Sequence, residues 1–320
     1  MKAKSSRREF IRQAVTASAT VLAMPSFLQG AGSATRRKMK LSLSAGAIGV
    51  KASPREVFAL AQKHGFEAVE ANAAFLTDLS DTELSELRAD MRAKGLVFGA
   101  AGLSVDFRHD DGKFREGMRT LPHLAEGLKQ AGAEQVGTWV SPAHDELDYE
   151  RNLHQHATRL REIARVLKDN GLRLGLEYVG TPTGRQGHKY PFIHSMREMG
   201  KLIAEIGTGN VGYVLDTWHW WTAGETEADL LSLKASDVVS VDMNDAPAGI
   251  PIESQQDGQR ELPCATGVIP TKVFVNALNR INYDGPVRCE PFNKALARLD
   301  KDAACAAVIT ALRKAMDLIE

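Results

Sequence analysis

Cysteine is scarce in this 320-residue chain, and neither sign of charge is in excess. The three cysteines, Cys264, Cys289 and Cys305, include no Cys-x-x-Cys pair, and an odd number cannot all form disulfides. We therefore interpret them as structural residues rather than as zinc ligands or a catalytic thiol. Forty basic and forty acidic residues cancel. A chain without a basic excess argues against a nucleic-acid partner, because such proteins usually carry a basic face.

A long hydrophobic run is missing from the N-terminal segment as well. The moderately apolar stretch 14–28 is too short for a membrane span, so we expect no stable membrane anchor. It follows the paired Arg7 and Arg8 and precedes the small residues 31–34, an order that resembles the twin-arginine export signal. We predict that residues 1–34 are a cleavable signal read by the twin-arginine export machinery, and that the mature protein is periplasmic. The alternative is an ordinary basic amphipathic helix.

No Gly-x-Gly-x-x-Gly motif follows the first expected strand, which argues against a dinucleotide-binding domain. From residue 39 onward, strand-like apolar runs alternate with amphipathic segments. Strands are expected at 40–45, 68–71, 97–101, 135–140, 173–178, 211–215, 238–243 and 286–290. Helices are expected at 54–64, 81–94, 113–131, 149–170, 193–206, 271–281 and 300–318. This alternation is typical of an α/β protein with a (β/α)8 TIM barrel, which we predict as a single domain over residues 35–320.

Acidic residues stand at the carboxyl ends of four of these expected strands. They are Glu177, Asp216, Asp242 and Glu290. The C-terminal ends of the strands converge on one mouth of a parallel barrel, so acids far apart in sequence can meet there around one divalent cation. A single acid at a strand end is commonly a helix cap or an ion-pair partner, so the hypothesis depends on all four together. The sequence therefore predicts a metal enzyme.

Two loops, 179–192 and 245–269, are longer than a plain barrel requires. Long loops at the C-terminal mouth usually cover or shape an active site. They carry His188 and Arg260, which we predict to contact the substrate, although most loop charges are expected to be solvated. Trp139, at the end of the fourth expected strand, is a further candidate for substrate binding.

Several short motifs carry a family resemblance. They are Glu177, the segments DTWH at 216–219 and DMND at 242–245, RELPCATG at 260–267, and YDGPVRCEPF at 283–292. Together they resemble the sugar phosphate isomerase/epimerase family with the xylose-isomerase-like barrel, from about residue 39 to the end of the chain. The resemblance implies a TIM barrel with one divalent metal at its mouth. Its most specific part is Asp216 followed three residues later by His219.

The resemblance also implies roles for single residues. It places Glu177, Asp216 and Glu290 on metal-ligand positions, and His219 on a substrate-contacting position. Asp242 departs from the pattern, because the family usually has a histidine ligand there. As a ligand, Asp242 would complete a site of four carboxylates, which favours Mn²⁺ or Mg²⁺ and leaves Zn²⁺ as another option. Alternatively, Asp242 no longer binds metal.

This set of residues suits proton transfer beside a carbonyl group. Such chemistry removes a C–H proton and stabilises the resulting enediolate, and a bound cation supplies the stabilisation. Glu177 and Glu290 could act as base and acid on opposite faces of a bound sugar. We therefore predict a metal-dependent isomerase or epimerase of a small-molecule sugar or keto-sugar, with homodimer formation left open. Two alternatives remain: a metal-dependent lyase or hydrolase of a sugar derivative, and a non-catalytic periplasmic sugar-binding protein.

Overall fold

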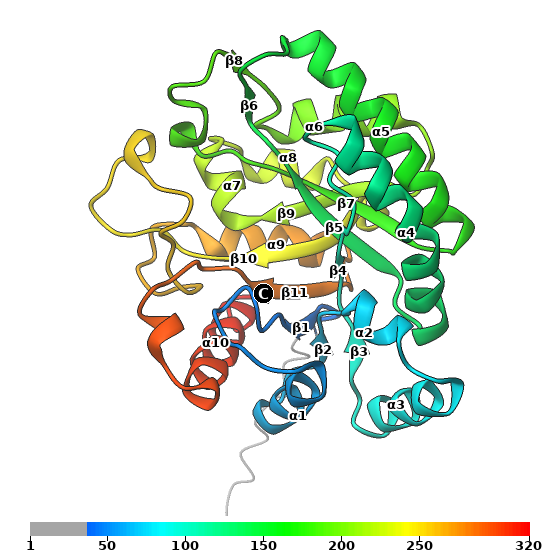
Figure 1. Ribbon diagram of the computed structural model, residues 1–320. Helices are drawn as coiled ribbons and strands as arrows, with labels where there is room; N and C mark the ends of the chain where they lie inside the picture. Colours follow the sequence, from blue (N-terminus) through cyan, green and yellow to red (C-terminus); the bar gives the residue numbers. More distant parts are fainter. Residues whose placement is uncertain (1–36) are drawn as a thin grey trace, which may run out of the picture. The chain divides into compact units, whose positions relative to one another are not determined.

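The computed structural model describes residues 37–320, and the signal predicted for residues 1–34 lies outside the described residues. The described part forms a parallel sheet that curls into a barrel, with the helices on its outside (Figure 1). This arrangement confirms the predicted (β/α)8 barrel fold. Nine strands make up the sheet: β1 Lys40–Leu43, β2 Ala68–Val69, β3 Val97–Phe98, β4 Ala101–Gly102, β5 Gln135–Val140, β7 Arg173–Tyr178, β9 Val211–Asp216, β10 Val238–Met243 and β11 Pro286–Cys289.

The barrel closes through the segment 97–102. The strand order runs β3-β2-β1-β11-β10-β9-β7-β5-β4, so both ends of the order belong to this one segment. The sequence predicts a single strand here, whereas the structure splits it into β3, which pairs with β2, and β4, which pairs with β5. Gly99 stands at the break, where a Cβ atom would lie only 2.7 Å from Ser42 Oγ. A larger residue at position 99 would therefore have to displace the Ser42 side chain on β1, which favours glycine here.

Ten α-helices occur in the described residues: α1 Pro54–His64, α2 Ala73–Thr77, α3 Asp81–Ala93, α4 Asp111–Ala131, α5 Tyr149–Asp169, α6 Met196–Ile206, α7 Thr217–Thr222, α8 Glu227–Leu231, α9 Thr271–Arg280 and α10 Lys301–Met316. The ends of α1 show how local sequence sets these bounds. Ser53 and Glu56 form a capping box, Pro54 occupies the first turn, and Gly65 ends the helix in the left-handed conformation. None of the described helices is long and apolar enough to cross a membrane.

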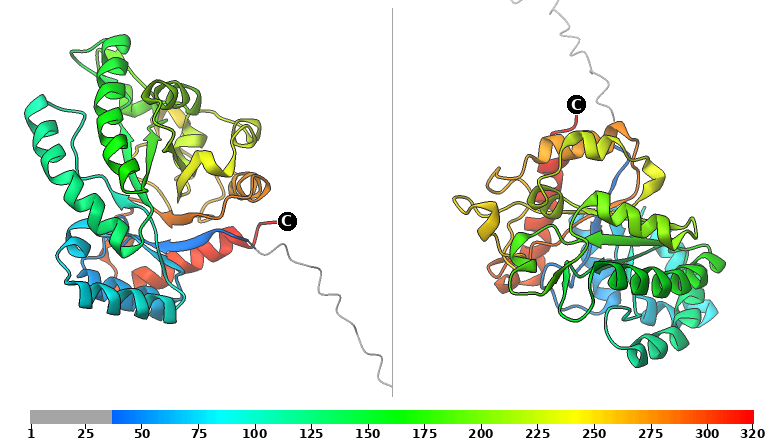
Figure 2. Two further views of the ribbon diagram at one scale, coloured as in Figure 1. Left: turned by 90° about the vertical axis from the view of Figure 1, so that its right-hand side faces the viewer. Right: turned by 90° about the horizontal axis from the view of Figure 1, so that it is seen from above.

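The hydrophobic core lies between the strands and the inner faces of the helices. Two further views show the helices packed side by side around the barrel, with α4 against α5 and α1 against α10 (Figure 2). Leu174 and Val241 on strands, and Leu160 and Leu312 on helices, are fully buried in one continuous cluster. Burial of each such side chain contributes roughly 1.5–3 kcal/mol to the stability of the fold. This packing holds the strands in place, and with them the polar residues at the strand ends.

The long loops cover the C-terminal ends of the strands. They contact each other through two short 3-10 helices, η1 Pro182–Arg185 and η3 Ile252–Ser254. Residues of the first loop also form strand β8 Tyr190–Pro191, which pairs antiparallel with β6 Ala143–His144. Asp245 organises the second loop, because its carboxylate accepts hydrogen bonds from the N–H groups of Thr266, Gly267 and Ile269. Strand pairing and hydrogen bonds therefore hold both loops in place at the mouth of the barrel.

Candidate active site

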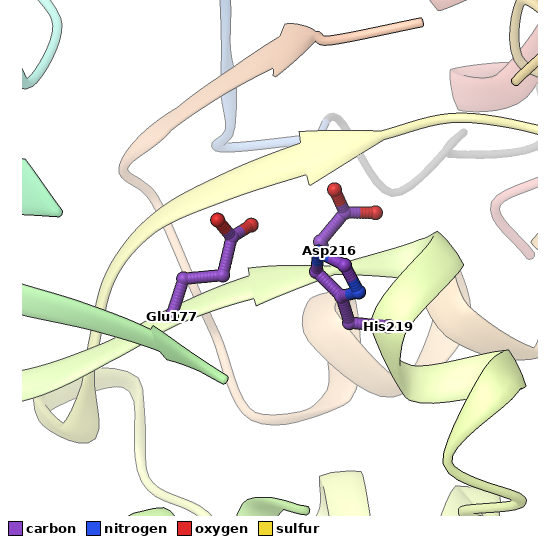
Figure 3. Close-up of side chains that lie close together, drawn as sticks. All are labelled: Glu177, Asp216 and His219. Atoms are coloured by element: carbon purple, nitrogen blue, oxygen red, sulfur yellow. The ribbon is translucent and has the colours of Figure 1, made fainter. Parts of the chain in front are cut away.

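Four carboxylates meet at the C-terminal mouth of the barrel. Glu177 belongs to β7, Asp216 ends β9, Asp242 belongs to β10, and Glu290 directly follows β11. Each offers one oxygen atom, and these four atoms lie within 4.8 Å of one another. Figure 3 shows Glu177 and Asp216 extending from neighbouring strands toward the same side, with the ring of His219 beside Asp216. The structure thus brings together the four acids that the sequence suggests as metal ligands.

Strand register explains this meeting. Asp216 pairs with Asp242 across β9 and β10, and Asp242 pairs with Arg288 across β10 and β11. Paired residues of parallel strands point to the same face, so these three side chains form a row inside the barrel. Glu290 stands two residues after Arg288 and shares its face. Cys289, between them, is buried in the core on the other side, as the alternation of a strand predicts.

Arg260 reaches this cluster from the second loop. Its Nη1 donates to Asp216 Oδ2 at 2.8 Å and lies 3.5 Å from Glu290 Oε2, while Nη2 donates to Asp257 Oδ1 at 2.8 Å. Burial acts to lower the pKa of Arg260, but the charges of the surrounding acids, Asp216 and Asp257 first and then Glu290 and Glu177, together raise that pKa above its usual value. The sequence suggests an arginine that is exposed unless it binds substrate. The structure instead buries it to 2% exposure among acids.

Arg288 is a second cation of the site, and the sequence analysis missed it. Its Nε donates to Asp242 Oδ1 at 2.5 Å and its Nη2 to Asp242 Oδ2 at 3.0 Å, while Nη2 also lies 3.4 Å from Glu290 Oε1. This two-pronged geometry is the strong form of an arginine–carboxylate pair. The signal that could have revealed it is the spacing to Glu290, because residues two apart on a strand share a face.

Asn244, one residue beyond β10, fixes the geometry around Asp216. Its Nδ2 donates to both carboxylate oxygens of Asp216, at 3.1 and 3.0 Å, and its Oδ1 accepts from the N–H of Glu290 at 3.1 Å. The N–H of Trp218 also donates to Asp216 Oδ1 at 2.6 Å. Burial raises the pKa of Asp216 to about 6, with Arg260 acting in the opposite direction. Asp216 is thus tightly held before any ligand arrives.

Glu177 is the least satisfied acid of the cluster. Its Oε1 is buried and accepts no hydrogen bond from any residue that the structure describes. Burial raises the pKa of Glu177 well above its usual value, and the charges of Glu290 and Asp216 raise it further. Burial, followed by the charge of Asp242, likewise raises the pKa of Glu290 to about 7. Carboxylates this close cannot all be ionised without additional positive charge.

His219 lies on α7 directly beside the acids and is buried. Its Nδ1 accepts a hydrogen bond from the N–H of Gly180 at 3.2 Å, and its Nε2 lies 3.2 Å from Arg260 Nη2. Burial, followed by the positive charge of Arg260, lowers the pKa of His219 to about 3, so the ring is neutral. One ligand atom each of Glu177, Asp216 and His219 also lie within 4.8 Å of one another.

A cavity of about 760 Å³ opens above the cluster. Its lining includes Glu177, Glu290, His219, Arg260 and Trp139, all of which the sequence analysis named, together with the unpredicted Arg108, Asp257, Arg288 and Phe292. His188 lies apart from this set. It is not among the lining residues, and its Nδ1 lies 3.1 Å from Asp145 Oδ2 on the exposed surface. Its role in substrate binding stays a prediction that its position does not support.

The residues present fit a divalent cation. Four carboxylates face two guanidinium groups, so with all four acids ionised two formal negative charges remain for a cation to balance, and both arginines also face further acids, Asp257 and Glu70. The buried Oε1 of Glu177 adds an oxygen acceptor without a donor among the described residues. An oxygen-rich, negatively charged site suits a hard cation. Asp216 and Asp242 are each held by an arginine, so a cation and the arginines would share the same carboxylates.

A charged cluster at the C-terminal mouth of a (β/α)8 barrel defines a TIM-barrel enzyme, because barrels of this kind carry their active sites on that face. The chain belongs to the xylose isomerase-like TIM barrel family, whose match extends over residues 58–317. The family resemblance found in the sequence motifs is thereby confirmed.

Two relatives of known name are similar to this chain. Inosose isomerase of Bacillus velezensis is 24% identical over 248 residues, which cover 75% of this chain and 84% of that protein. D-psicose 3-epimerase of Enterocloster bolteae is 25% identical over 240 residues, which cover 71% of this chain and 73% of that protein. The chain is therefore related to sugar isomerases and epimerases over most of its length.

Two solved structures show the same fold. A xylose isomerase domain protein from Alicyclobacillus acidocaldarius superposes with a TM-score of 0.77 at 30% identity, covering 88% of this chain and 99% of that one. The IolI protein, solved with a bound zinc atom, superposes with a TM-score of 0.71 at 20% identity, covering 88% of this chain and 98% of that one. At that lower identity the likeness concerns the fold.

Proposed function

We propose that this protein is a divalent-metal-dependent isomerase or epimerase of a sugar or keto-sugar. The observation that carries the proposal is the meeting of Glu177, Asp216, Asp242 and Glu290 at the mouth, with an excess of negative charge under a cavity. The names of the relatives, an inosose isomerase and a D-psicose 3-epimerase, support the same reaction class.

The cation would be held by oxygens of Glu177, Asp216 and Glu290, with Asp242 as the fourth ligand where Arg288 gives up part of its pairing. When bound, it supplies Lewis-acid stabilisation of the negative charge that develops on the substrate oxygens. The all-carboxylate set favours Mn²⁺ or Mg²⁺. Zinc stays an alternative, because one fold neighbour was solved with a zinc atom and His219 lies beside two of the acids.

Glu177 and Glu290 are the proposed acid and base. Both line the cavity, on β7 and after β11, so a sugar lying between them presents a different face to each carboxylate. One takes the proton from the carbon next to the carbonyl, and the other delivers a proton to the neighbouring atom or to the opposite face. The pKa of Glu290, raised to about 7, brings its proton exchange into the neutral range, and burial also raises the pKa of Glu177 well above its usual value.

The arginines and His219 position the substrate in this proposal. Arg260 and Arg288 present guanidinium groups to the cavity beside the acids, where they can donate to hydroxyl or carbonyl oxygens of the sugar. The neutral His219 ring can form a hydrogen bond with a substrate hydroxyl when Arg260 moves away from its Nε2 atom. Trp139 offers a flat apolar surface at the mouth.

The cellular setting is a separate proposal. The twin-arginine motif in residues 1–34 supports export by the twin-arginine machinery to the periplasm, where unphosphorylated sugars are the expected substrates. Size-exclusion chromatography with light scattering would test whether the protein forms a homodimer. Fractionation of cells that express the full chain would separately test the export. Retention in the cytoplasm after Arg7 and Arg8 are replaced by lysine is the expected result.

Solvent-deuterium exchange tests the reaction. The protein is loaded with Mn²⁺ in D₂O and given a panel of keto-sugars, and NMR follows deuterium entry at carbons next to the carbonyl. We expect exchange in the wild type, and at least a hundredfold slower exchange in Glu177→Gln and Glu290→Gln. Glu253→Gln, at an exposed position in the second loop, is the matched control.

Other outcomes would replace the proposal. Oxygen from water appearing in the product without deuterium at carbon would indicate a hydrolase, and loss of water from the sugar would indicate a lyase. Tight binding of a sugar without exchange, in a protein that holds stoichiometric metal, would indicate a binding protein.

A further inference from the structure

The cavity has room for more than one sugar ring. Its volume of about 760 Å³ lies within the roughly 300–1,000 Å³ typical of pockets that enclose drug-sized ligands. The proposed chemistry needs only the part of this cavity that lies against Glu177 and Glu290. A single sugar ring held against these two carboxylates would fill only part of the volume.

Two exposed aromatic side chains line the same cavity. Among the described residues, the exposed large hydrophobic side chains include two aromatic ones, Trp139 at 47% and Phe292 at 44% exposure, and both line this cavity. Trp139 pairs in register with Glu177, and Phe292 follows Glu290 by two residues. Each proposed catalytic acid thus has an exposed aromatic ring close to it along the mouth. Exposed aromatic surface in a pocket indicates a binding site for an apolar face.

Each ring packs against the guanidinium group of an arginine. The guanidinium carbon of Arg108 lies 4.3 Å from the ring centre of Trp139, and that of Arg260 lies 4.8 Å from the ring centre of Phe292. The side chain of Arg108 is 16% exposed and that of Arg260 only 1%, so each ring packs against a mostly buried guanidinium while nearly half of the residue's own surface stays exposed. Both rings are therefore supported surfaces with a free side.

The backbone around these rings is fixed as well. Arg108 donates through Nε to the carbonyl of Trp139 at 3.0 Å. Phe292 has a φ of 43°, which is unusual for a residue other than glycine and costs on the order of 1 kcal/mol or more. The N–H of Arg260 donates to the carbonyl of Pro291 at 3.1 Å and helps hold this conformation. Strain kept at a pocket residue suggests that the position of the ring matters for binding.

The charges of the cavity point to an uncharged ligand at the mouth. Arg260 pairs with Asp216 and Asp257, Arg288 pairs with Asp242, and Arg108 lies 3.7 Å from an oxygen of Asp106. Each of these three lining arginines already faces a carboxylate. A phosphate or carboxylate substituent would find no unpaired cation among them, whereas a neutral ring with an apolar face would fit the aromatic surfaces.

We infer that the substrate is a glycoside of at least two sugar rings, with the reacting ring at Glu177 and Glu290 and a second, uncharged ring packed against Trp139 and Phe292. The inference rests on the proposed function for the identity of the reacting ring. It adds the substrate class: a neutral disaccharide, or the end of a longer saccharide, rather than a free monosaccharide or a sugar phosphate.

Paired ligands test the inference. Isothermal titration calorimetry of the metal-loaded, full-length protein compares its affinity for D-fructose with its affinity for lactulose, in which galactose is attached to the same ketose. The second pair compares D-glucose with cellobiose. We expect the disaccharide to bind at least tenfold more tightly than its monosaccharide in one pair. We expect Trp139→Ala and Phe292→Ala each to reduce that ratio by about fivefold or more. Leu299→Ala, which replaces another exposed apolar side chain away from the cavity lining, should leave the ratio unchanged.

Two results would overturn the inference: equal affinity for monosaccharide and disaccharide in both pairs, or alanine variants that weaken both ligands by the same factor. Circular dichroism melting checks that the variants fold, and Trp139→Phe and Phe292→Leu serve as milder substitutions that should keep part of the ratio. Deuterium exchange separates this question from the proposed reaction. Exchange with monosaccharides and no preference for disaccharides would reject the second-ring site alone, whereas preferential disaccharide binding without exchange would reject the reaction alone.

Discussion

Arg288 and Asp242 form a two-pronged ion pair inside the barrel, with Nε to Oδ1 at 2.5 Å and Nη2 to Oδ2 at 3.0 Å. The two residues also pair in register across β10 and β11. In the family resemblance, the position of Asp242 usually holds a neutral histidine ligand. This chain has an acid there with an arginine on the next strand, so the pair adds no net charge to the row. The carboxylate at this position is thus neutralised by a cation on the next strand.

Removal of that cation should strengthen metal binding. In Arg288→Gln, Asp242 loses its partner and the cluster becomes more negative by one charge. Unit charges about 4 Å apart interact by about 4 kcal/mol at an effective dielectric of 20, so a gain in Mn²⁺ affinity of tenfold or more is expected. Titration of the metal-free protein with Mn²⁺, followed by electron paramagnetic resonance, measures the affinity. Arg280→Gln, which removes an exposed ion pair with Glu227, is the control. Weaker binding in Arg288→Gln would mean that Arg288 supports the metal site.

The Glu177 side chain should lower the free energy of unfolding of the metal-free protein. It is buried, its Oε1 accepts no hydrogen bond from the described residues, and three other acids raise its pKa. Glu177→Gln removes an acid that ionises readily in the unfolded chain but is disfavoured as a carboxylate in the folded protein, so we expect the free energy of unfolding without metal at neutral pH to rise by about 1 kcal/mol or more, while deuterium exchange is lost. Chemical denaturation in the presence of a chelator measures the first quantity. An unchanged or lower stability would show that Glu177 is well accommodated as it stands.

The fold could be predicted from the sequence wherever local signals and burial agree. The strands at 135–140, 173–178 and 238–243 have the predicted bounds, because each is rich in apolar residues, and the barrel buries 173–178 and 238–243 almost completely. Helix 54–64 also has the predicted bounds, which its capping residues set. The split at Gly99 could not be predicted, since it depends on the pairing of β3 with β2 and of β4 with β5 across the closure of the barrel. The short helices α2, α7 and α8 were missed for the same kind of reason, because a helix of one or two turns depends on its tertiary surroundings.

The candidate site was predictable in its acids but not in its cations. Glu177 and Asp216 could be found because strand ends converge on the mouth of any parallel barrel. Arg288 obeys the same logic and was overlooked. The burial of Arg260 follows from the path of the loop 245–269, which depends on the hydrogen bonds of Asp245 to distant N–H groups. No sequence period encodes such a loop path, so the pairing of Arg260 with Asp216 required the structure.

Gly180 should be needed for the position of His219. A Cβ atom on Gly180 would clash with the carbonyl oxygen of His219 and lie 3.0 Å from the N of Ala223. Gly180→Ala therefore pushes on the backbone of α7, and we expect it to lower the free energy of unfolding by about 1–3 kcal/mol and to reduce activity. Gly46→Ala is a suitable control, because a Cβ there meets no atom within 4 Å. Thermal melting and exchange kinetics of both variants measure the effect, and equal behaviour of the two would refute the packing argument.

His156 on α5 should make the barrel sensitive to acid. Its ring is 1% exposed between Phe107 and Phe192, and its Nδ1 donates to the carbonyl of Asn152 at 3.0 Å. Burial lowers the pKa of His156 from 6.5 to about 4; the bond to Asn152 opposes this shift, and the positive charges of Arg108 and Arg159 add to it. Because the unfolded chain binds the proton more readily, the stability from this residue is complete above pH 6.5. It is lost as the pH falls toward 4.

The difference between a pKa of 6.5 in the unfolded chain and about 4 in the folded protein lowers the free energy of unfolding by about 3 kcal/mol between pH 6.5 and pH 4. In His156→Phe, which fills the same apolar site without a titrating group, the free energy of unfolding should fall less steeply between pH 6.5 and pH 4 than in the wild type. His154→Phe, at an exposed position on the same helix, should retain the wild-type slope. Urea denaturation across this range gives the slopes directly. Subtracting one curve from the other removes the acids that titrate in the same range, such as Glu225, whose pKa burial raises to about 7. Parallel curves for wild type and His156→Phe would show that His156 is not the source of the acid sensitivity.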